Sequence, residues 1–302
     1  MTGEISSPTK RKPVRISRRT MLLGGAGLVM ASGAALAGYS GLEAAGMLDV
    51  TRYRLTPRGW PAGQRLSITV IADLHAGGPN MGRARIQDVV EVANTLRSDI
   101  VLLLGDYVAT HRFVTEVVPP DVWAGELARL RAPLGVHAIL GNHDWWHHQA
   151  EIRQALASAK IPVMENSAVL LGEPGARFWL AGLGDQIAYV LGRGRFRGID
   201  DLPGTLAQVT TDDPVILMAH EPDIFTEVPD RVSITLAGHT HGGQIRLPLV
   251  WPRVVPSRYG ARFAYGHISE GGRDMIVSGG LGTSFVPMRL GVPPEILRID
   301  LG

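Results

Sequence analysis

Aspartate, asparagine and histidine side chains collect where apolar runs of the sequence end. Asp73 and His75 directly follow one run, Asp106 follows a second, and Asn142 and His143 follow a third. Carboxylate, amide and imidazole donors of this kind bind divalent metal ions. Because open α/β sheets place their ligands at the carboxyl ends of the strands, we expect these donors to lie close together.

Three further histidines repeat the pattern in the second half of the chain. His220 follows the apolar run 215–219, and His239 and His241 follow the run 232–237. Taken singly, each motif has an ordinary structural explanation, since a Gly-Asp pair after a strand is usually a turn. Five of the ten histidines, however, fall at successive strand ends in company with two aspartates and an asparagine. The joint pattern therefore favours a shared metal site.

The spacing of Asp73 and His75 adds to this hypothesis. In an extended backbone, side chains at positions i and i+2 point to the same side. One metal ion could then take both residues. The chain contains no cysteine, so the donor set is nitrogen and oxygen only, which suits manganese, iron or zinc better than calcium. It does not choose among these three metals.

The elements that must position these residues follow an alternating order. Apolar runs predict strands at 68–72, 100–104 and 136–140, and helical periodicity predicts helices at 82–97, near 123–130 and at 152–159. Short strands predominate afterwards, at 167–172, 177–183, 215–219, 232–237, 243–247, 274–278 and 295–300. Parallel β-α-β units that lead into a strand-rich half predict an α/β fold with two packed sheets and helices outside.

Residues 1–37 have the composition of an export signal. A basic segment precedes the uncharged apolar run 21–38, and the adjacent Arg18 and Arg19 stand just before that run. This arrangement is typical of a twin-arginine signal, whose export machinery carries folded proteins. Ala35-Leu36-Ala37 offers a cleavage site, and the alternative is an uncleaved single-span anchor. We therefore expect a location in the periplasm or cell envelope, either released or held at the membrane by this segment.

The charge of the chain belongs mainly to this segment. The formal net charge is +2, but residues 1–37 carry six basic residues and one acidic residue, which leaves −3 for the remainder. The body is therefore not basic, and we expect no specific nucleic-acid partner. We interpret residues 38–64 as a linker and residues 65–302 as the catalytic domain.

The motifs together resemble those of the calcineurin-like metallophosphoesterase family. Its five blocks occur in the family's order within residues 66–245, as Asp73-x-His75, Gly105-Asp106, Gly141-Asn142-His143-Asp144, His220 and Gly238-His239-x-His241. The C-terminal segments 280–284 and 289–295 are similar to the exported YaeI/YkuE-like branch. The resemblance implies a four-layer α/β/β/α sandwich, in which two packed mixed sheets are flanked by helices and hold a dinuclear metal site at their edge.

The resemblance also implies a role for each residue. One divalent ion would be held by Asp73, His75, Asp106 and His241, and a second by Asp106, Asn142, His220 and His239, so that Asp106 bridges the two. A hydroxide between the ions would attack phosphorus. His143 would stabilise the phosphoryl oxygens and protonate the leaving group. Asp144 would bind no metal itself but would orient the residues that do.

Differences from the motifs of related families narrow the range of substrate classes to consider. Phosphoserine/threonine phosphatases of this superfamily continue the second block as G-D-Y-V-D-R-G, whereas here Ala109, Thr110 and His111 follow Val108. The resemblance therefore favours a phosphodiesterase that acts on a small-molecule, lipid or wall-polymer ester. One alternative is a lipid-directed phosphoesterase or pyrophosphatase similar to UDP-diacylglucosamine hydrolases, which requires an apolar groove beside the metals. Another is a non-catalytic envelope protein that binds metal and cell wall.

Aromatic and basic residues near the third block are the remaining substrate signal. Trp145 and Trp146 follow His143, and residues 189–197 interleave aromatic side chains with arginines. Such groups beside a phosphate site could hold a base, a sugar or a lipid headgroup. We favour the simpler interpretation, in which one tryptophan packs in the core and the arginines lie on a solvated loop.

Overall fold

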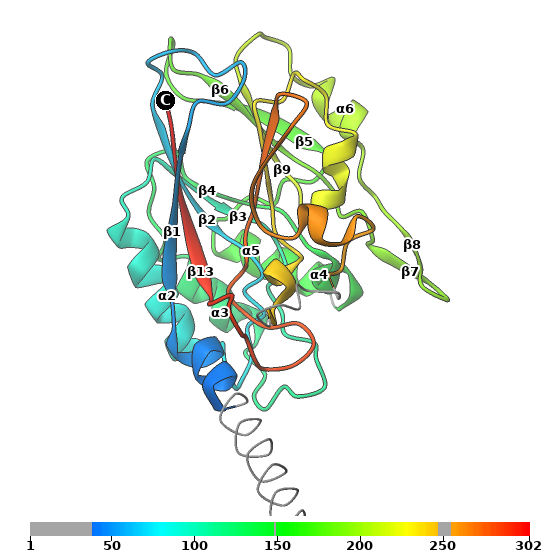
Figure 1. The fold of residues 1–302 in the computed structure, drawn as a ribbon. Helices are drawn as coiled ribbons and strands as arrows, with labels where there is room; N and C mark the ends of the chain where they lie inside the picture. The colour runs from blue at the N-terminus through cyan, green and yellow to red at the C-terminus, as the bar shows by residue number, and fades with distance from the viewer. Residues whose placement is uncertain (1–37, 148, 247–254) are drawn as a thin grey trace, which may run out of the picture. The chain divides into compact units, whose positions relative to one another are not determined.

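The computed structural model describes residues 38–147, 149–246 and 255–302 (Figure 1). The predicted signal, with its arginine pair and cleavage site, lies outside these ranges. Within them, no helix is both long enough and apolar enough to cross a membrane. Residues 40–302 form one compact unit, which contains every strand of both large sheets.

Two mixed sheets form the centre of this unit. The first contains, in spatial order, β1 (Asp49–Leu55), β13 (Glu295–Leu301), β2 (Leu66–Ile71), β3 (Ile100–Leu103) and β4 (Val136–Ala138). The second contains β11 (Gly266–Glu270), β12 (Arg273–Val277), β10 (Ile234–Ala237), β9 (Val215–Met218), β6 (Phe178–Gly182) and β5 (Ser167–Leu171). Strands β2, β3 and β4 run parallel in the first sheet, as do β12, β10, β9 and β6 in the second. The strands that carry the site therefore share a direction within each sheet.

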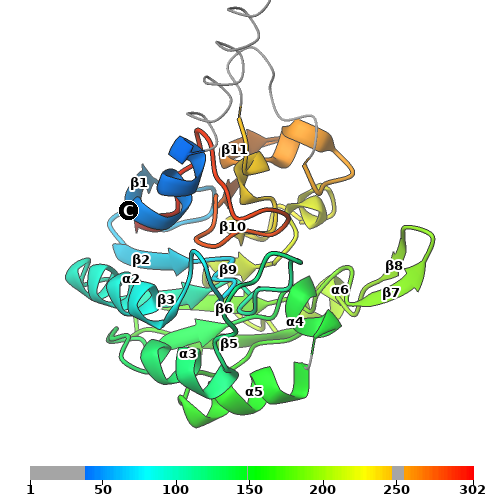
Figure 2. The same cartoon turned by 90° about the horizontal axis from the view of Figure 1, so that it is seen from below.

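Helices cover the outer faces of both sheets (Figures 1 and 2). The first sheet packs against α2 (Arg83–Thr95), α3 (Pro120–Leu127) and α5 (Gln149–Ser158). The second packs against α6 (Leu202–Leu206) and the short 3₁₀ helices η1 (Pro222–Thr226) and η3 (Gly260–Phe263). Two more short helices, α4 (Asn142–Trp146) and η2 (His241–Gly243), carry residues of the predicted site.

Alternating side chains connect these layers. In β3, Val101 and Leu103 pack under the helices, whereas Ile100 and Leu102 face the second sheet. Successive strand residues point to opposite faces, and a strand buried on both faces must be apolar throughout. The same alternation in β9 joins the core between the sheets to the core beneath α6. The predicted four-layer α/β/β/α sandwich is therefore confirmed.

The predicted linker is wrong for most of its length. Residues 40–46 are helical, and Glu43 is buried, where its Oε1 accepts a hydrogen bond from the backbone N–H of Val292 at 2.9 Å. Residues 49–55 form edge strand β1, which pairs in parallel with β13. The sequence gives little sign of this strand, because its side chains are half exposed and its partner strand lies at the other end of the chain.

The predicted strand 243–247 is also wrong within its described part, which ends at residue 246. Gln244 has a positive φ of 48°, and Ile245 makes only an isolated bridge with Leu290. The Gln244 amide instead donates to the carbonyl oxygens of Val286 and Met288 at 2.8 and 3.0 Å. The segment therefore holds the C-terminal loop in place and does not extend a sheet.

Candidate active site

The predicted ligands meet where the carboxyl ends of the two sheets face each other. Asp73 and Asp106 follow β2 and β3 of the first sheet, and His220 and His239 follow β9 and β10 of the second. Three groups have ligand atoms within 4.8 Å of one another, namely Asp73 with His75 and His241, His75 with Asp106 and His143, and Asp106 with His220 and His239. The structure thus brings together residues from five strand ends.

Asn142 joins the second half of this cluster. Its Oδ1 lies 2.9 Å from Nδ1 of His239 and 3.2 Å from Nε2 of His220. All seven predicted ligands therefore fall in one continuous, almost completely buried cluster.

Asp106 occupies the centre of the cluster. Its Oδ2 lies 3.5 Å from Nε2 of His75 and 3.2 Å from Nε2 of His220. Its Oδ1 accepts a hydrogen bond from the backbone N–H of His143 at 2.9 Å, which fixes the carboxylate. One oxygen therefore faces both halves of the cluster, so Asp106 could serve a cation in each half.

The orientation of two histidines prepares their Nε2 atoms for a metal. His75 Nδ1 lies 3.0 Å from the carbonyl oxygen of Val108, and His220 Nδ1 lies 2.7 Å from that of Leu104. Because a carbonyl oxygen can only accept, Nδ1 of each ring carries a hydrogen. Nε2 of each ring then faces Asp106 as a potential ligand, in the arrangement that protein metal sites use to orient imidazoles.

Asp73 shows that the cluster suits a cation. Its Oδ1 accepts from the backbone N–H of His239 at 2.9 Å, but its buried Oδ2 has no hydrogen-bond partner among the described residues. An unpaired buried carboxylate oxygen is costly. A divalent ion would satisfy it, so the donors present here fit a metal.

The backbone at the ligands is unusual. Asp73, His75, Asp106, His239 and His241 all have φ between 44° and 69°, a region that few residues other than glycine adopt. The extended backbone assumed for the Asp73–His75 spacing is therefore wrong, although the two side chains do reach one group. Strained conformations of this kind gather at functional sites, where the surrounding fold enforces them.

Close packing around the predicted ligands explains why Gly141 and Asp144 occupy their positions in the third block, Gly141-Asn142-His143-Asp144. A Cβ at Gly141 would lie 2.4 Å from Oδ1 of Asp106, so only glycine fits. Asp144 accepts backbone hydrogen bonds from Gly141, Asp106 and Tyr107 at 2.8 to 2.9 Å. Burial, and then the nearby Asp106, raises the pKa of Asp144 to about 7. Asp144 thus holds the backbone of two ligand loops together without reaching the ligand atoms.

His143 lies beside the cluster with a hydroxyl group at each ring nitrogen. Thr110 Oγ1 contacts Nδ1, and Ser284 Oγ lies 3.3 Å from Nε2. Burial lowers the pKa of His143 below its ordinary value. Sequence reasoning gave no role to Thr110 or Ser284, although each stands in a quoted motif segment. Their side-chain contacts, with partners far along the chain, leave no local signal.

Arg289 is a third residue to which sequence reasoning gave no role. It is fully buried, and its Nη2 donates to Nδ1 of His241 at 3.2 Å and to the carbonyl oxygen of Gly282 at 2.6 Å. Burial, then His75 and the Arg289 guanidinium, hold the pKa of His241 well below its usual range. Arg289 thus keeps this ligand neutral and ties the C-terminal loop to the site.

Protonation of the metal-free cluster differs between ligands. Burial raises the pKa of Asp73 to about 7 and lowers the pKa values of His75 and His239 to about 3 and about 4. Burial opposes the charge of His220, but Asp106 outweighs it and raises the pKa of His220 well above its usual value. Without metal, the second proton on the His220 ring therefore supplies the positive charge beside Asp106 that a cation would otherwise supply.

Metal binding should accordingly release protons and weaken as the pH falls through 7. His220 must lose its proton, and Asp73 is half protonated near pH 7, whereas His75 and His239 are already neutral there. We expect between about one and two protons released per chain at pH 7, and nearer two at pH 6. Calorimetric titration in buffers of different ionisation enthalpy measures this number. Metal uptake without proton release would contradict the assignment.

A cavity of about 780 Å³ opens beside the ligands. Asn142, His143 and His239 line its inner end, and Trp146, Phe196 and Phe285 are among its apolar lining. Trp146 stacks on Phe196 with ring centroids 5.8 Å apart. Aromatic side chains therefore line the cavity beside the predicted metal ligands.

Trp145 has a different environment from its neighbour. It packs edge-on against Tyr189 at 5.5 Å and carries the guanidinium of Arg153 at 5.4 Å. One tryptophan of the pair thus packs within the fold while the other faces the cavity. The arginines interpreted as part of a solvated loop belong instead to a hairpin formed by β7 (Tyr189–Gly192) and β8 (Arg195–Arg197).

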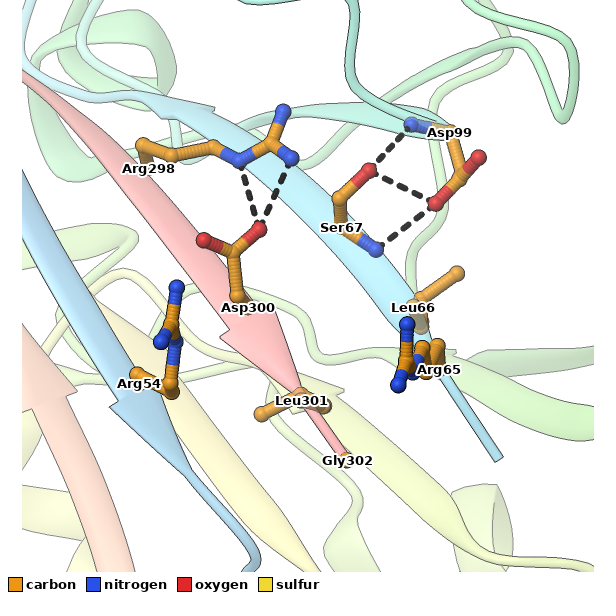
Figure 3. A pocket seen from close by; sticks show the side chains of 9 residues that line it. All are labelled: Arg54, Arg65, Leu66, Ser67, Asp99, Arg298, Asp300, Leu301 and Gly302. Carbon is orange, nitrogen blue, oxygen red and sulfur yellow. Dashed lines mark hydrogen bonds and ion pairs between the residues drawn. The ribbon is translucent and has the colours of Figure 1, made fainter. Parts of the chain in front are cut away.

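A second cavity, of about 650 Å³, lies near the amino end of β2 and the carboxyl end of β13 (Figure 3). It contains no predicted ligand, and a six-residue strand separates it from Asp73 by roughly 20 Å. Two of its acidic groups are paired, because Arg298 contacts Asp300 at 2.8 Å and the Ser67 hydroxyl donates to Asp99 at 2.6 Å. The first contact lies within β13 and the second joins β2 to the start of β3. The predicted ligands lie at the other end of these strands.

Comparison with known proteins agrees with this geometry. The family described as calcineurin-like phosphoesterase matches residues 66–243. An uncharacterised metallophosphoesterase of Aquifex aeolicus is 31% identical over 88% of this chain and 96% of the relative. Metallophosphoesterase YkuE of Bacillus subtilis is 29% identical over 95% of this chain and 98% of its own. Phosphodiesterase YaeI of Escherichia coli is 30% identical over 95% of this chain and 99% of its own.

The family resemblance inferred from the motifs is therefore confirmed. The matched residues 66–243 include all seven predicted ligands and His143. The chain belongs to the calcineurin-like phosphoesterase family and is a hydrolase that acts on phosphoric esters.

Proposed function

We propose that this protein is a phosphodiesterase that uses two divalent ions, manganese, iron or zinc. The observation that carries the proposal is the position of Asp106, whose Oδ2 faces a histidine of each ligand group while His143 lies beside them. The name of YaeI, a phosphodiesterase matched over nearly its whole length, supports the same reaction.

The residues of the site would have separate roles in the reaction. Ions bound to the cluster would polarise the phosphoryl oxygens and lower the pKa of a water molecule. His143 lines the cavity, and its Nε2 contacts the Ser284 hydroxyl at 3.3 Å, so this atom can donate a hydrogen bond or a proton to the leaving oxygen. The contact of Thr110 with Nδ1 fixes the ring for that step.

Hydrolysis of bis-p-nitrophenyl phosphate and p-nitrophenyl phosphate tests the proposal. We expect activity to disappear on chelation, to return with manganese, zinc or iron, and to favour the diester. The chain should begin no later than residue 40, because residues 40–46 contact the C-terminal loop through Glu43. A preference for the monoester would overturn the diesterase assignment. No hydrolysis by a folded sample that binds two ions would favour a non-catalytic envelope protein.

The cavity supports a lipid-directed phosphoesterase or pyrophosphatase as a second candidate. Such an enzyme requires an apolar groove at the metals, and Trp146, Phe196 and Phe285 supply apolar lining within the same cavity as His143. Hydrolysis of a short-chain phospholipid with a KM far below that of the soluble diester would select this candidate. Equal KM values would favour a polar substrate.

We further propose export by the twin-arginine route, with the enzyme acting in the periplasm or cell envelope and in contact with the membrane. The support is the arginine pair before the apolar run. Replacing both residues, Arg18→Lys with Arg19→Lys, should retain the protein in the cytoplasm, which cell fractionation measures. Export unchanged by this pair of substitutions would contradict the route, and the control Arg11→Lys should leave export intact.

A further inference from the structure

The β7–β8 hairpin exposes apolar side chains at its tip. Val190 and Leu191 are 58% and 51% exposed, and every residue of both strands is exposed. Figures 1 and 2 both show the hairpin standing away from the body of the protein. An exposed apolar group of this kind marks a contact with a membrane or another protein.

The hairpin is also cationic. Residues 189–197 contain Arg193, Arg195 and Arg197 and no acidic residue, although residues 38–302 as a whole carry a net charge of −3. Arg197 lies over the Tyr189 ring at 4.6 Å. Arg193 and Arg195 have no hydrogen bond or ion pair with any other part of the chain that the structure describes. Positive charge is therefore concentrated beside the apolar tip and is available to a partner.

We propose that this hairpin docks on an anionic phospholipid bilayer. Val190 and Leu191 enter the boundary between headgroups and acyl chains, and the arginines contact lipid phosphates. Arginine suits this boundary because its stem packs on apolar groups while its guanidinium binds phosphate. A stable protein partner needs roughly 800 Å² on each side, more than the two apolar side chains at the tip supply by themselves, so a bilayer is the favoured occupant.

The base of the hairpin connects this surface to the active site. Phe196 stacks on Trp146 at 5.8 Å, and the Trp146 indole donates to the carbonyl oxygen of Ile187 at 3.0 Å. Phe196 and Phe285, the latter 62% exposed, both line the cavity. Docking would therefore bring the cavity mouth to the bilayer. Delivery of a lipid substrate in this way rests on the proposed function, whereas bilayer binding does not.

Co-sedimentation with vesicles tests the proposal without any turnover. The protein used is residues 40–302, the compact unit that contains both large sheets. It is mixed with vesicles of phosphatidylcholine alone, or with vesicles of equal parts phosphatidylcholine and phosphatidylglycerol. We expect binding to the anionic vesicles only. Arg193→Gln with Arg195→Gln should weaken it about 25-fold, at about fivefold per arginine. Val190→Ser with Leu191→Ser should weaken it about tenfold or more.

Two exposed arginines at the second cavity provide the matched control. Arg54→Gln with Arg65→Gln removes the same charge far from the hairpin and should leave binding unchanged. If the two arginine pairs weakened binding equally, binding would depend on the net charge of the protein and not on the hairpin, which would overturn the proposal. Absence of binding to anionic vesicles would overturn the proposal and leave the tip to a protein partner. Thermal melts of all variants exclude unfolding as the cause.

The absence of native cysteine allows a direct measurement of contact. A fluorophore that brightens in apolar surroundings, attached through Leu191→Cys, should brighten on anionic vesicles. The same label on Arg65→Cys should not respond. A response at residue 65 and none at residue 191 would show that the protein binds vesicles by another face, and would overturn the proposal.

Discussion

Asp106→Ala is expected to remove both metal binding and hydrolysis. The carboxylate is the only group whose single oxygen faces His75 and His220 among the described residues, at 3.5 and 3.2 Å. Its loss removes a member of two of the three ligand groups, and it also removes the bond from the backbone N–H of His143. Because the proposed reaction depends on the ions, we expect a loss of at least about 10³-fold in kcat/KM.

Metal content and activity measured on the same sample check this prediction. Asp106→Asn keeps an oxygen that can accept from His143 but removes the charge, so it should bind metal weakly while folding normally. Asp99→Ala is a matched control, because Asp99 precedes the same strand at its other end and borders the second cavity. Two ions bound at full affinity by Asp106→Ala would refute the bridging position.

The motifs predicted which residues would meet at one site, because each of these residues lies at or near a strand end. Each ligand follows a short apolar run, and parallel strands bring their carboxyl ends to one edge whatever the details of the loops. The layer order was predictable for the same reason, since strands apolar on both faces need cover on both faces. These inferences did not require the distances between strands.

What the sequence could not predict depends on partners far along the chain. Edge strand β1 contains no apolar run, its alternation is broken by Thr51 and Arg52, and its partner is the distant β13, so no local signal marks it. Arg289 reaches His241 only because the C-terminal loop folds back on the site. Likewise, Ser284 lies beside His143 across a separation of 141 residues. Side-chain contacts of this kind need the folded backbone.

The ligand backbone illustrates a different limit. Local propensity favours extended or helical φ at Asp73 and His75, yet both adopt φ near 50°. Tertiary packing enforces this geometry, because Gly280 and Gly282 pass so close that a Cβ at either would lie 2.7 Å or less from atoms of residues 73–75. The sequence therefore predicted that the side chains of Asp73 and His75 lie together, but it did so from the wrong local conformation.

His143→Ala is expected to separate catalysis from metal binding. His143 has its own contacts to Thr110 and Ser284. It belongs to one of the three ligand groups and is absent from the other two, which are Asp73 with His75 and His241 and Asp106 with His220 and His239. Its removal takes away a donor to the leaving oxygen. We therefore expect kcat to fall about 10²- to 10⁴-fold, with both ions retained and KM little changed.

The leaving group provides the sharpest readout for this variant. A diester whose leaving alcohol is as acidic as p-nitrophenol needs little protonation, so His143→Ala should lose less activity on it than on a diester of an alkyl alcohol. His137→Ala is the control, because His137 lies on β4 with its Nε2 at the carbonyl oxygen of Leu134 and outside the cluster. Equal losses on both substrates would show that His143 positions the phosphate and does not supply the proton, whereas loss of metal would make it a ligand.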